Sequence, residues 1–177
     1  MELTQEQKGK IGETAVMLEL LQKGFNVINI NNSYPNYKNA DLICMNANNG
    51  KSVMIQVKTG TTHNILTGFT SELDGTIQKL EESIIGPWVF VYMPDDKMSN
   101  MEFYILTREE VIELIYSSNK WYATEYYRKL KKKYPVGVYV DWLEGGSSKA
   151  TKLHPEYKST LHQTSKDNWW KITELLK

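Results

Sequence analysis

Two runs that lie close together in the chain decide the fold: Ala40-Asp41-Leu42-Ile43-Cys44-Met45 and Ser52-Val53-Met54-Ile55-Gln56-Val57-Lys58. Both are rich in apolar and β-branched residues, which favour strands, and an Asn/Gly-rich segment separates them. We therefore expect a β-hairpin. Its first strand opens with an acid, and its second strand closes with a carboxamide and a lysine.

The turn of this hairpin predicts which residues face one another. Asn49-Gly50 is a typical central pair of a two-residue type I′ turn. Such a turn sets Asp41 opposite Lys58 and Ile43 opposite Gln56. Because side chains alternate along a strand, Asp41, Gln56 and Lys58 would share one face of the sheet. Taken alone, this group is either a structural Asp–Lys pair or part of a functional site.

The composition is that of a globular protein with a single domain. At 177 residues, of which 41% are apolar and 24% charged, the chain can bury a core. No apolar stretch reaches the ~20 residues that span a bilayer, and the first residues lack a signal-peptide pattern. We therefore expect a cytoplasmic protein with no membrane partner. The single cysteine, Cys44, excludes an internal disulfide and a cysteine-based zinc cluster, and its context predicts a small buried side chain.

Helical and strand patterns surround the hairpin. Thr4 with Gln7 forms a capping box, so a helix is predicted from residue 5 to about residue 23, ended by Gly24. Thr107 with Glu110 forms a second capping box, which opens a helix to about residue 116. The remaining predicted elements are strands over 25–30, 88–93, 102–106 and 136–140, helices over 73–85, 121–133 and 166–176, and a surface loop over 143–165.

This order of elements favours an α/β fold with a central mixed β-sheet flanked by helices. Consecutive strands pair first, and a helical crossover adds a later strand. The run over 88–93 is apolar throughout, as in a strand covered on both faces. Trp169 and Trp170 are expected to dock the last helix on the core, although neighbouring helical residues point in different directions and one can stay exposed.

A second acid, Glu13, lies outside the hairpin, on a helix stripe shared with core-type residues: Gly9, Glu13, Val16 and Leu20. Gly9 and Gly12 each cost about 1 kcal/mol of helix stability relative to alanine. Glycine in a helix often marks close packing against another backbone. We therefore expect Glu13 to lie near the sheet, where it could join Asp41 and Gln56 as oxygen ligands of Mg²⁺.

Three features together resemble the PD-(D/E)XK, or restriction endonuclease-like, nuclease superfamily: Glu13 on an N-terminal helix, Ala40-Asp41 opening a strand, and Gln56-Val57-Lys58 closing the next strand. The resemblance covers about residues 5–107. It implies a three-layer α/β fold, with residues 108–177 as a helical and basic extension within one domain, 1–177. The usual second motif is Glu-x-Lys, whereas this chain has a Gln-x-Lys variant similar to that of Mrr-like enzymes. Ala40 also replaces the usual proline.

The resemblance implies a role for each of these residues. Asp41 would be the main ligand of Mg²⁺ (or Mn²⁺), with the side-chain oxygen of Gln56 and the backbone carbonyl of Val57 as further ligands. Lys58 would orient the attacking water or stabilise charge on the phosphorane. Glu13 would bind a second metal or position a metal-bound water. Gln56 brings one negative charge fewer than glutamate, so weaker cation binding, or none, is an alternative.

The net charge of zero hides an uneven distribution. Residues 1–118 hold nine Lys/Arg and 15 Asp/Glu, whereas 119–158 hold nine Lys/Arg and four Asp/Glu. A local basic region can serve a nucleic-acid partner. The same segment, however, fits a solvated helix that buries Tyr126, Leu130 and Tyr134. The candidate nucleic-acid-binding residues are Arg128, Lys129, Lys131, Lys132 and Lys133.

Taken together, the sequence favours a metal-dependent nuclease that hydrolyses DNA. One alternative is a catalytically inactive nuclease-fold module that binds nucleic acid or another partner. Another is a structural domain in which Asp41 and Lys58 form a simple pair. Many nucleases of the resembled family act as dimers, which leaves a homodimer open, but no feature of the sequence specifies an interface.

Overall fold

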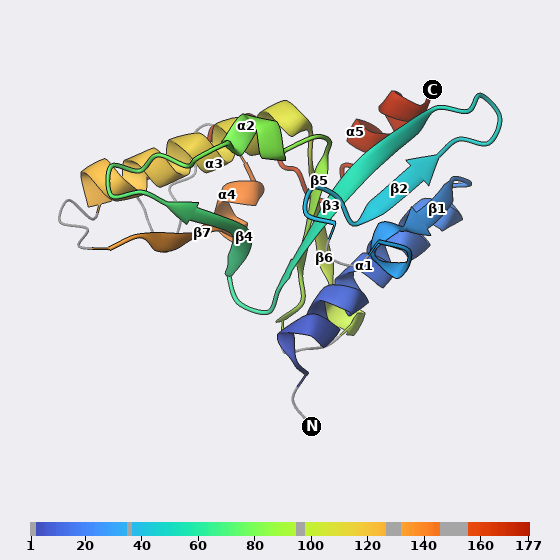
Figure 1. Ribbon diagram of the computed structural model, residues 1–177, viewed down its shortest axis with the longest axis horizontal. Helices are drawn as coiled ribbons and strands as arrows, with labels where there is room; N and C mark the ends of the chain where they lie inside the picture. Colours follow the sequence, from blue (N-terminus) through green and yellow to red (C-terminus); the bar gives the residue numbers. More distant parts are fainter. Residues whose placement is uncertain (1–2, 35–36, 95–97, 127–131, 146–155) are drawn as a thin grey trace.

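A mixed β-sheet runs through the middle of the computed structural model (Figure 1). The structure describes residues 3–34, 37–94, 98–126, 132–145 and 156–177. The pair β3–β5 is parallel and the other neighbouring pairs are antiparallel. The predicted α/β class, with a central mixed sheet flanked by helices, is therefore confirmed. The five strands, in spatial order, are β1 (Asn26–Asn29), β2 (Leu42–Met45), β3 (Ser52–Gly60), β5 (Trp88–Tyr92) and β6 (Glu102–Leu106).

Both predicted capping boxes open a helix. Helix α1 (Gln5–Gln22) follows Thr4, whose hydroxyl accepts the backbone N–H of Gln7 at 3.2 Å. Helix α3 (Arg108–Trp121) follows a box of the same kind at Thr107. It runs beyond the predicted end and continues as the π-helix η4 (Tyr122–Tyr126). The predicted helix over 121–133 is thus a π-helix as far as residue 126, and residues 127–131 lie outside the described part of the chain.

The β2–β3 hairpin has the predicted faces but not the predicted register. Ile43 pairs with Met54 and not with Gln56, a shift of two residues. The backbone N–H of Asn46 donates to the carbonyl of Lys51 at 2.9 Å, so the loop is longer than a two-residue turn. The predicted type I′ turn, with Asp41 opposite Lys58, is therefore wrong. An even shift leaves each side chain on its predicted face, since the strand period is two.

Apolar side chains cover both faces of the sheet. On one face, α1 and the C-terminal helices α5 (Trp170–Thr173) and η5 (Glu174–Leu176) pack on β2, β3 and β5. On the other face, α3 and α4 (Val140–Leu143) pack on β5 and β6. Strand β5 contributes to both cores, which explains its continuous apolar run. Cys44 is buried in the first core, as predicted, and burial raises the pKa of its thiol to about 11.

A second, two-stranded sheet pairs β4 (Asn64–Ser71) with β7 (Tyr134–Tyr139). The predicted edge strand over 136–140 therefore exists, but its partner β4 is a strand that the sequence did not indicate. The predicted helix over 73–85 is reduced to α2 (Leu80–Ser83). Gly75 interrupts it at a φ of +85°, a conformation that favours glycine.

The C-terminal part is anchored more firmly than predicted. Tyr157 and Leu161 are each 4% exposed, so the prediction of a surface loop over 143–165 is wrong at these two described positions. Trp169 is 7% exposed and Trp170 is 55% exposed, so one tryptophan docks and the other faces solvent.

Among the described residues, no helix is both long and apolar enough to span a membrane. Besides η5, the described part of the chain has the 3₁₀ helices η1 (Ile30–Asn32) and η3 (Met98–Asn100).

Candidate functional site: a polar hollow beside the central sheet

The four side chains singled out in the sequence line one hollow on the surface, with a volume of about 680 Å³. Helix α1 contributes Glu13, the segment directly before β2 contributes Asp41, and β3 contributes Gln56 and Lys58. Residues far apart in the chain thus meet at one place. The remaining lining residues are Glu6, Gly9, Lys10, Asn31, Tyr37 and Lys38.

Asp41 is the most tightly held of these groups. It lies directly before β2 and is 7% exposed. Its Oδ2 atom accepts the backbone N–H of Val57 at 2.8 Å, and its Oδ1 atom accepts the side-chain amide of Asn31 at 3.1 Å. The Gln56 carboxamide also donates to Oδ2. A buried carboxylate needs such donors, since an unpaired buried charge is costly.

Gln56 turns the nitrogen of its carboxamide toward Asp41, and the same nitrogen lies 3.5 Å from the carbonyl oxygen of Val57. A carboxamide presents a donor on one side and an acceptor on the other. A half-turn about its last bond would therefore present the Gln56 oxygen to the place that the nitrogen now occupies. The residue can bond a carboxylate in one orientation and a cation in the other.

Glu13 is partly buried, and its Oε2 atom accepts the side-chain amide of Asn29 at 2.7 Å. Burial raises the pKa of the Glu13 carboxyl, and the nearby charge of Asp41 raises it further, against the opposing effect of the Asn29 hydrogen bond. Two carboxylates are therefore held close enough to repel one another. Divalent cations bind between groups arranged in this way.

Lys58 projects from the face of β3 that also carries Gln56. Its ammonium lies 5.2 Å from the centre of the Trp88 ring, within the range of a cation–π contact. Burial lowers the pKa of Lys58, while the charges of Asp41 and Glu13 act in the opposite direction. The lysine is thus partly desolvated and lies within the influence of both carboxylate charges.

Sequence reasoning missed two asparagines that hold the carboxylates. Asn29 ends β1 and donates to Glu13, whereas Asn31 lies in η1 and donates to Asp41. The Asn29 side chain also accepts the backbone N–H of Asn31 at 2.9 Å, which caps η1. The signal in the sequence was the group of asparagines at and just after the end of the strand predicted over 25–30.

The basic segment is described only in part. Arg128, Lys129 and Lys131 lie outside the described residues. Lys132 is exposed, and the Lys133 ammonium pairs with Glu72 at 2.6 Å. The alternative of one helix that buries Tyr126 and Tyr134 is wrong, because Tyr126 ends a π-helix at 50% exposure and Tyr134 begins β7.

The hollow offers few ligands for a metal. No group of three or more His, Cys, Asp or Glu side chains within the described residues could hold a metal ion. The oxygen donors at its inner end are the carboxylates of Glu13 and Asp41 and the carboxamide of Gln56, with the carbonyl of Val57 next to Gln56. The Glu6 carboxylate also lines the hollow, but it pairs with Lys10. Oxygen donors in this number suit Mg²⁺, which keeps several waters.

Comparisons with known proteins add little to this geometry. No family model matches the chain, and no curated protein matches it. Among solved structures, a bacterial homing endonuclease, I-Ssp6803I, is similar over 61% of this chain and 68% of that chain, with 17% identity and a TM-score of 0.40. A likeness at this level carries no argument about activity.

Proposed function

We propose that this chain is a metal-dependent nuclease of the restriction endonuclease-like, or PD-(D/E)XK, type that hydrolyses phosphodiester bonds in DNA. One observation carries the proposal: a buried carboxylate, a second carboxylate, a carboxamide and a desolvated lysine line the same hollow. Groups whose pKa values are shifted by burial and by one another in a surface hollow are a mark of functional sites.

Mg²⁺ or Mn²⁺ would be held by Asp41 and Glu13, with the Gln56 oxygen and the Val57 carbonyl as neutral ligands. The donor set fits a hard cation, because all four groups offer oxygen and the two carboxylates repel one another without it. A cation bound there supplies Lewis-acid polarisation of the scissile phosphate. Asn29 and Asn31 would keep both carboxylates oriented toward the ion.

Lys58 would stabilise the charge that develops on the phosphate as the bond breaks. Its ammonium is partly desolvated, and electrostatic stabilisation is stronger where water is excluded. Trp88 would fix the position of the Lys58 ammonium through the cation–π contact. Lys10 and Lys38, which also line the hollow, would contact the flanking backbone phosphates of the DNA.

The test is cleavage of plasmid and linear DNA in the presence of Mg²⁺ or Mn²⁺. Lys58→Ala and Asp41→Asn are each expected to lower the cleavage rate at least ~100-fold, because the first removes the cation that stabilises charge on the phosphate and the second removes a charged ligand of the metal. Lys51→Ala, on the exposed hairpin loop, is the matched control and should cleave at the wild-type rate. Circular dichroism verifies that each variant is folded.

Two results would contradict the proposal. One is the absence of cleavage by pure wild-type protein with either cation over a range of substrates. The other is cleavage that Lys58→Ala leaves unchanged, since the activity would then come from another site or from a contaminant.

A second candidate function is a catalytically inactive module of the same fold that binds nucleic acid. The orientation of Gln56 favours it, because the carboxamide nitrogen bonds Asp41 at the place a cation would take. Such a module would bind DNA with an affinity that falls steeply with salt, without cleaving it. A titration of DNA binding at several salt concentrations separates this function from a purely structural role.

A further inference from the structure

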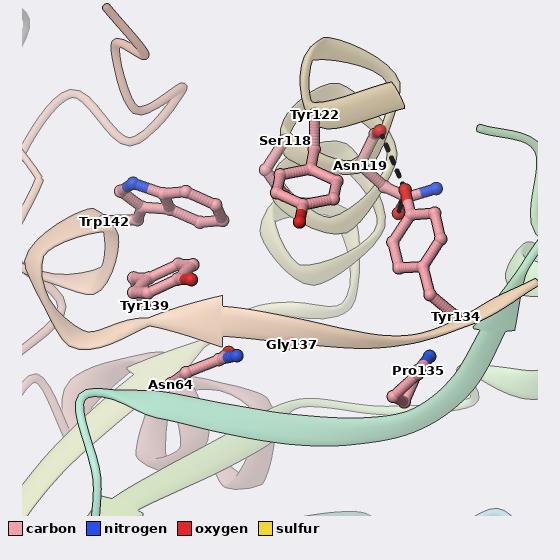
Figure 2. Close-up of a pocket in the computed structure, with 9 residues that line it drawn as sticks. All are labelled: Asn64, Ser118, Asn119, Tyr122, Tyr134, Pro135, Gly137, Tyr139 and Trp142. Carbon is pink, nitrogen blue, oxygen red and sulfur yellow. Dashed lines mark hydrogen bonds between the residues drawn. The ribbon is translucent and has the colours of Figure 1, made fainter. Parts of the chain in front are cut away.

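A small cavity with aromatic walls lies apart from the polar hollow, between the β4–β7 sheet and the end of α3 (Figure 2). Its volume is about 80 Å³. We call it the aromatic cavity. Its lining residues come from β4, α3, η4, β7 and α4: Asn64, Ser118, Asn119, Tyr122, Tyr134, Pro135, Gly137, Tyr139 and Trp142.

Two pairs of aromatic rings form the walls of the aromatic cavity. The ring centres of Tyr139 and Trp142 lie 4.7 Å apart, and those of Tyr122 and Tyr134 lie 5.3 Å apart. In Figure 2 the two pairs lie on opposite sides of the cavity, above β7. Rings arranged in this way offer faces on which a third flat ring can stack.

The walls are fixed by buried hydrogen bonds. The Tyr134 hydroxyl donates to Asn119 Oδ1 at 2.7 Å (Figure 2). Asn119 Nδ2 in turn donates to Ser71 Oγ at 3.0 Å. Asn119 is 4% exposed, so this network is held inside the protein. Tyr122 stands at the start of the π-helix η4, a distortion often found at functional sites. The rings are therefore positioned before any ligand arrives.

The floor of the aromatic cavity brings a carboxamide to the rings. A Cβ atom on residue 137 would collide with the Asn64 side chain, so Gly137 is what lets Asn64 lie across β7. Asn64 is exposed and presents both a donor and an acceptor. This combination can bond the polar edge of a heterocyclic ring.

The chemistry of the lining selects the class of ligand. None of its described side chains is charged, so neither a phosphate nor a cation gains an ion pair there. One water requires roughly 10–15 Å³ measured in this way, so the aromatic cavity has room for one ring of pyrimidine size. A neutral, flat ring with hydrogen-bonding groups at its edge fits best.

We propose that the aromatic cavity binds one unstacked nucleobase of a nucleic acid. This inference rests on the proposed function, since it assigns a second contact to the same substrate. Strand β4 links the two sites: Asn64 stands at its start, and a Cβ atom on Gly68, farther along, would lie 3.7 Å from the Lys58 ammonium. A base held in the aromatic cavity would anchor the nucleic-acid strand whose phosphate backbone enters the polar hollow.

The test compares two single-stranded DNA oligonucleotides of equal length, one of which lacks bases at its central nucleotides. Binding is measured by fluorescence anisotropy in EDTA, so that cleavage plays no part. Wild-type protein should bind the complete oligonucleotide about tenfold more tightly, the effect of one stacked base. Tyr122→Leu should reduce this ratio to about one, whereas Tyr116→Leu, an exposed tyrosine outside the aromatic cavity, should leave it unchanged.

Asn64→Ala supplies a variant at an exposed position that should fold normally. It is expected to change the order of affinities for oligo-dT, oligo-dC and oligo-dA, because the carboxamide contacts the edge of the base. The proposal is overturned if wild-type protein binds both oligonucleotides equally, or if folded Tyr122→Leu retains the tenfold preference. Binding of a trimethyllysine peptide in place of DNA would also overturn it, because the aromatic cavity would then be a cage for a cation.

Failure of this inference and failure of the proposed function give different results. A protein that cleaves DNA but binds both oligonucleotides equally has no base site. A protein that prefers the complete oligonucleotide but cleaves nothing keeps the base site and lacks the proposed catalysis.

Discussion

Glu13 and Asp41 show the cost of keeping two carboxylates together beside an apolar core. The pKa of Glu13 is raised, chiefly by burial and then by the charge of Asp41. Between the unfolded value and the raised folded value, the folded protein binds more protons than the unfolded chain. The free energy of unfolding therefore falls as pH rises through this window, and ionised Glu13 lowers stability at neutral pH.

Replacing Glu13 by glutamine should therefore stabilise the protein at neutral pH in EDTA. Glutamine keeps an oxygen for the Asn29 hydrogen bond but carries no charge. The gain should vanish below the ordinary pKa of 4.5, where Glu13 is protonated in both states. Urea unfolding at neutral pH and below pH 4.5 measures this gain in the free energy of unfolding. Glu19→Gln, which breaks a surface pair with Lys23, is the control and should change stability by less than ~1 kcal/mol. A Glu13→Gln variant less stable than wild type at neutral pH would contradict this account.

Helix α1 reaches the sheet through one glycine. A Cβ atom on Gly12 would overlap the Thr59 side chain of β3, whereas a Cβ atom on Gly9 would meet nothing within 4 Å. The close approach at Gly12 is what lets Glu13, one residue farther along, reach the hollow. The prediction that glycine marks close packing is therefore confirmed for Gly12 and wrong for Gly9.

The two glycines should respond oppositely to substitution by alanine. Gly12→Ala is expected to destabilise by about 1–3 kcal/mol, because the added methyl group forces α1 away from Thr59. Gly9→Ala is expected to stabilise by up to ~1 kcal/mol through helix propensity alone. Urea unfolding of both variants tests the pair. Equal effects would show that α1 does not approach β3 at Gly12.

At the scale of the whole molecule, the C-terminal segment completes the core on one face of the sheet. Trp169, Ile172 and Leu176 pack against α1 and β3. The carbonyl of Leu176 accepts the side-chain amides of Asn46 and Asn49, both at 2.9 Å. The last residues of the chain thus hold the hairpin loop far from them in sequence.

The neighbouring tryptophans provide a matched test of this docking. Trp169→Ala should destabilise by about 3–5 kcal/mol, as expected when a buried tryptophan is truncated. Trp170→Ala, at 55% exposure, should change stability by less than ~0.5 kcal/mol. Thermal unfolding followed by circular dichroism separates them. Similar losses of stability in the two variants would show that α5 packs on the core through another face.

Much of the fold could be predicted from the sequence wherever an element is specified by a local pattern of residues. The boxes at Thr4 and Thr107 opened helices, and the alternating and continuous apolar runs formed the strands of the main sheet. Strand β4 was missed because its partner β7 lies far along the chain. Pairing between strands that far apart produces no pattern in the sequence of either strand. The hairpin register was wrong because the loop is longer than a two-residue turn and closes between Asn46 and Lys51. The loop's Asn46 and Asn49 also bond Leu176, a contact that no short stretch of sequence contains.

The sequence by itself determined which side chains project from one face of the hairpin, because a strand period of two survives an even change of register. It also determined that Glu13 shares a helix stripe with core residues. Only the tertiary structure decided that Glu13, Asp41, Gln56 and Lys58 line one hollow, and that the aromatic cavity forms from five separate elements. Distances between elements depend on packing, which joins residues that no local pattern connects.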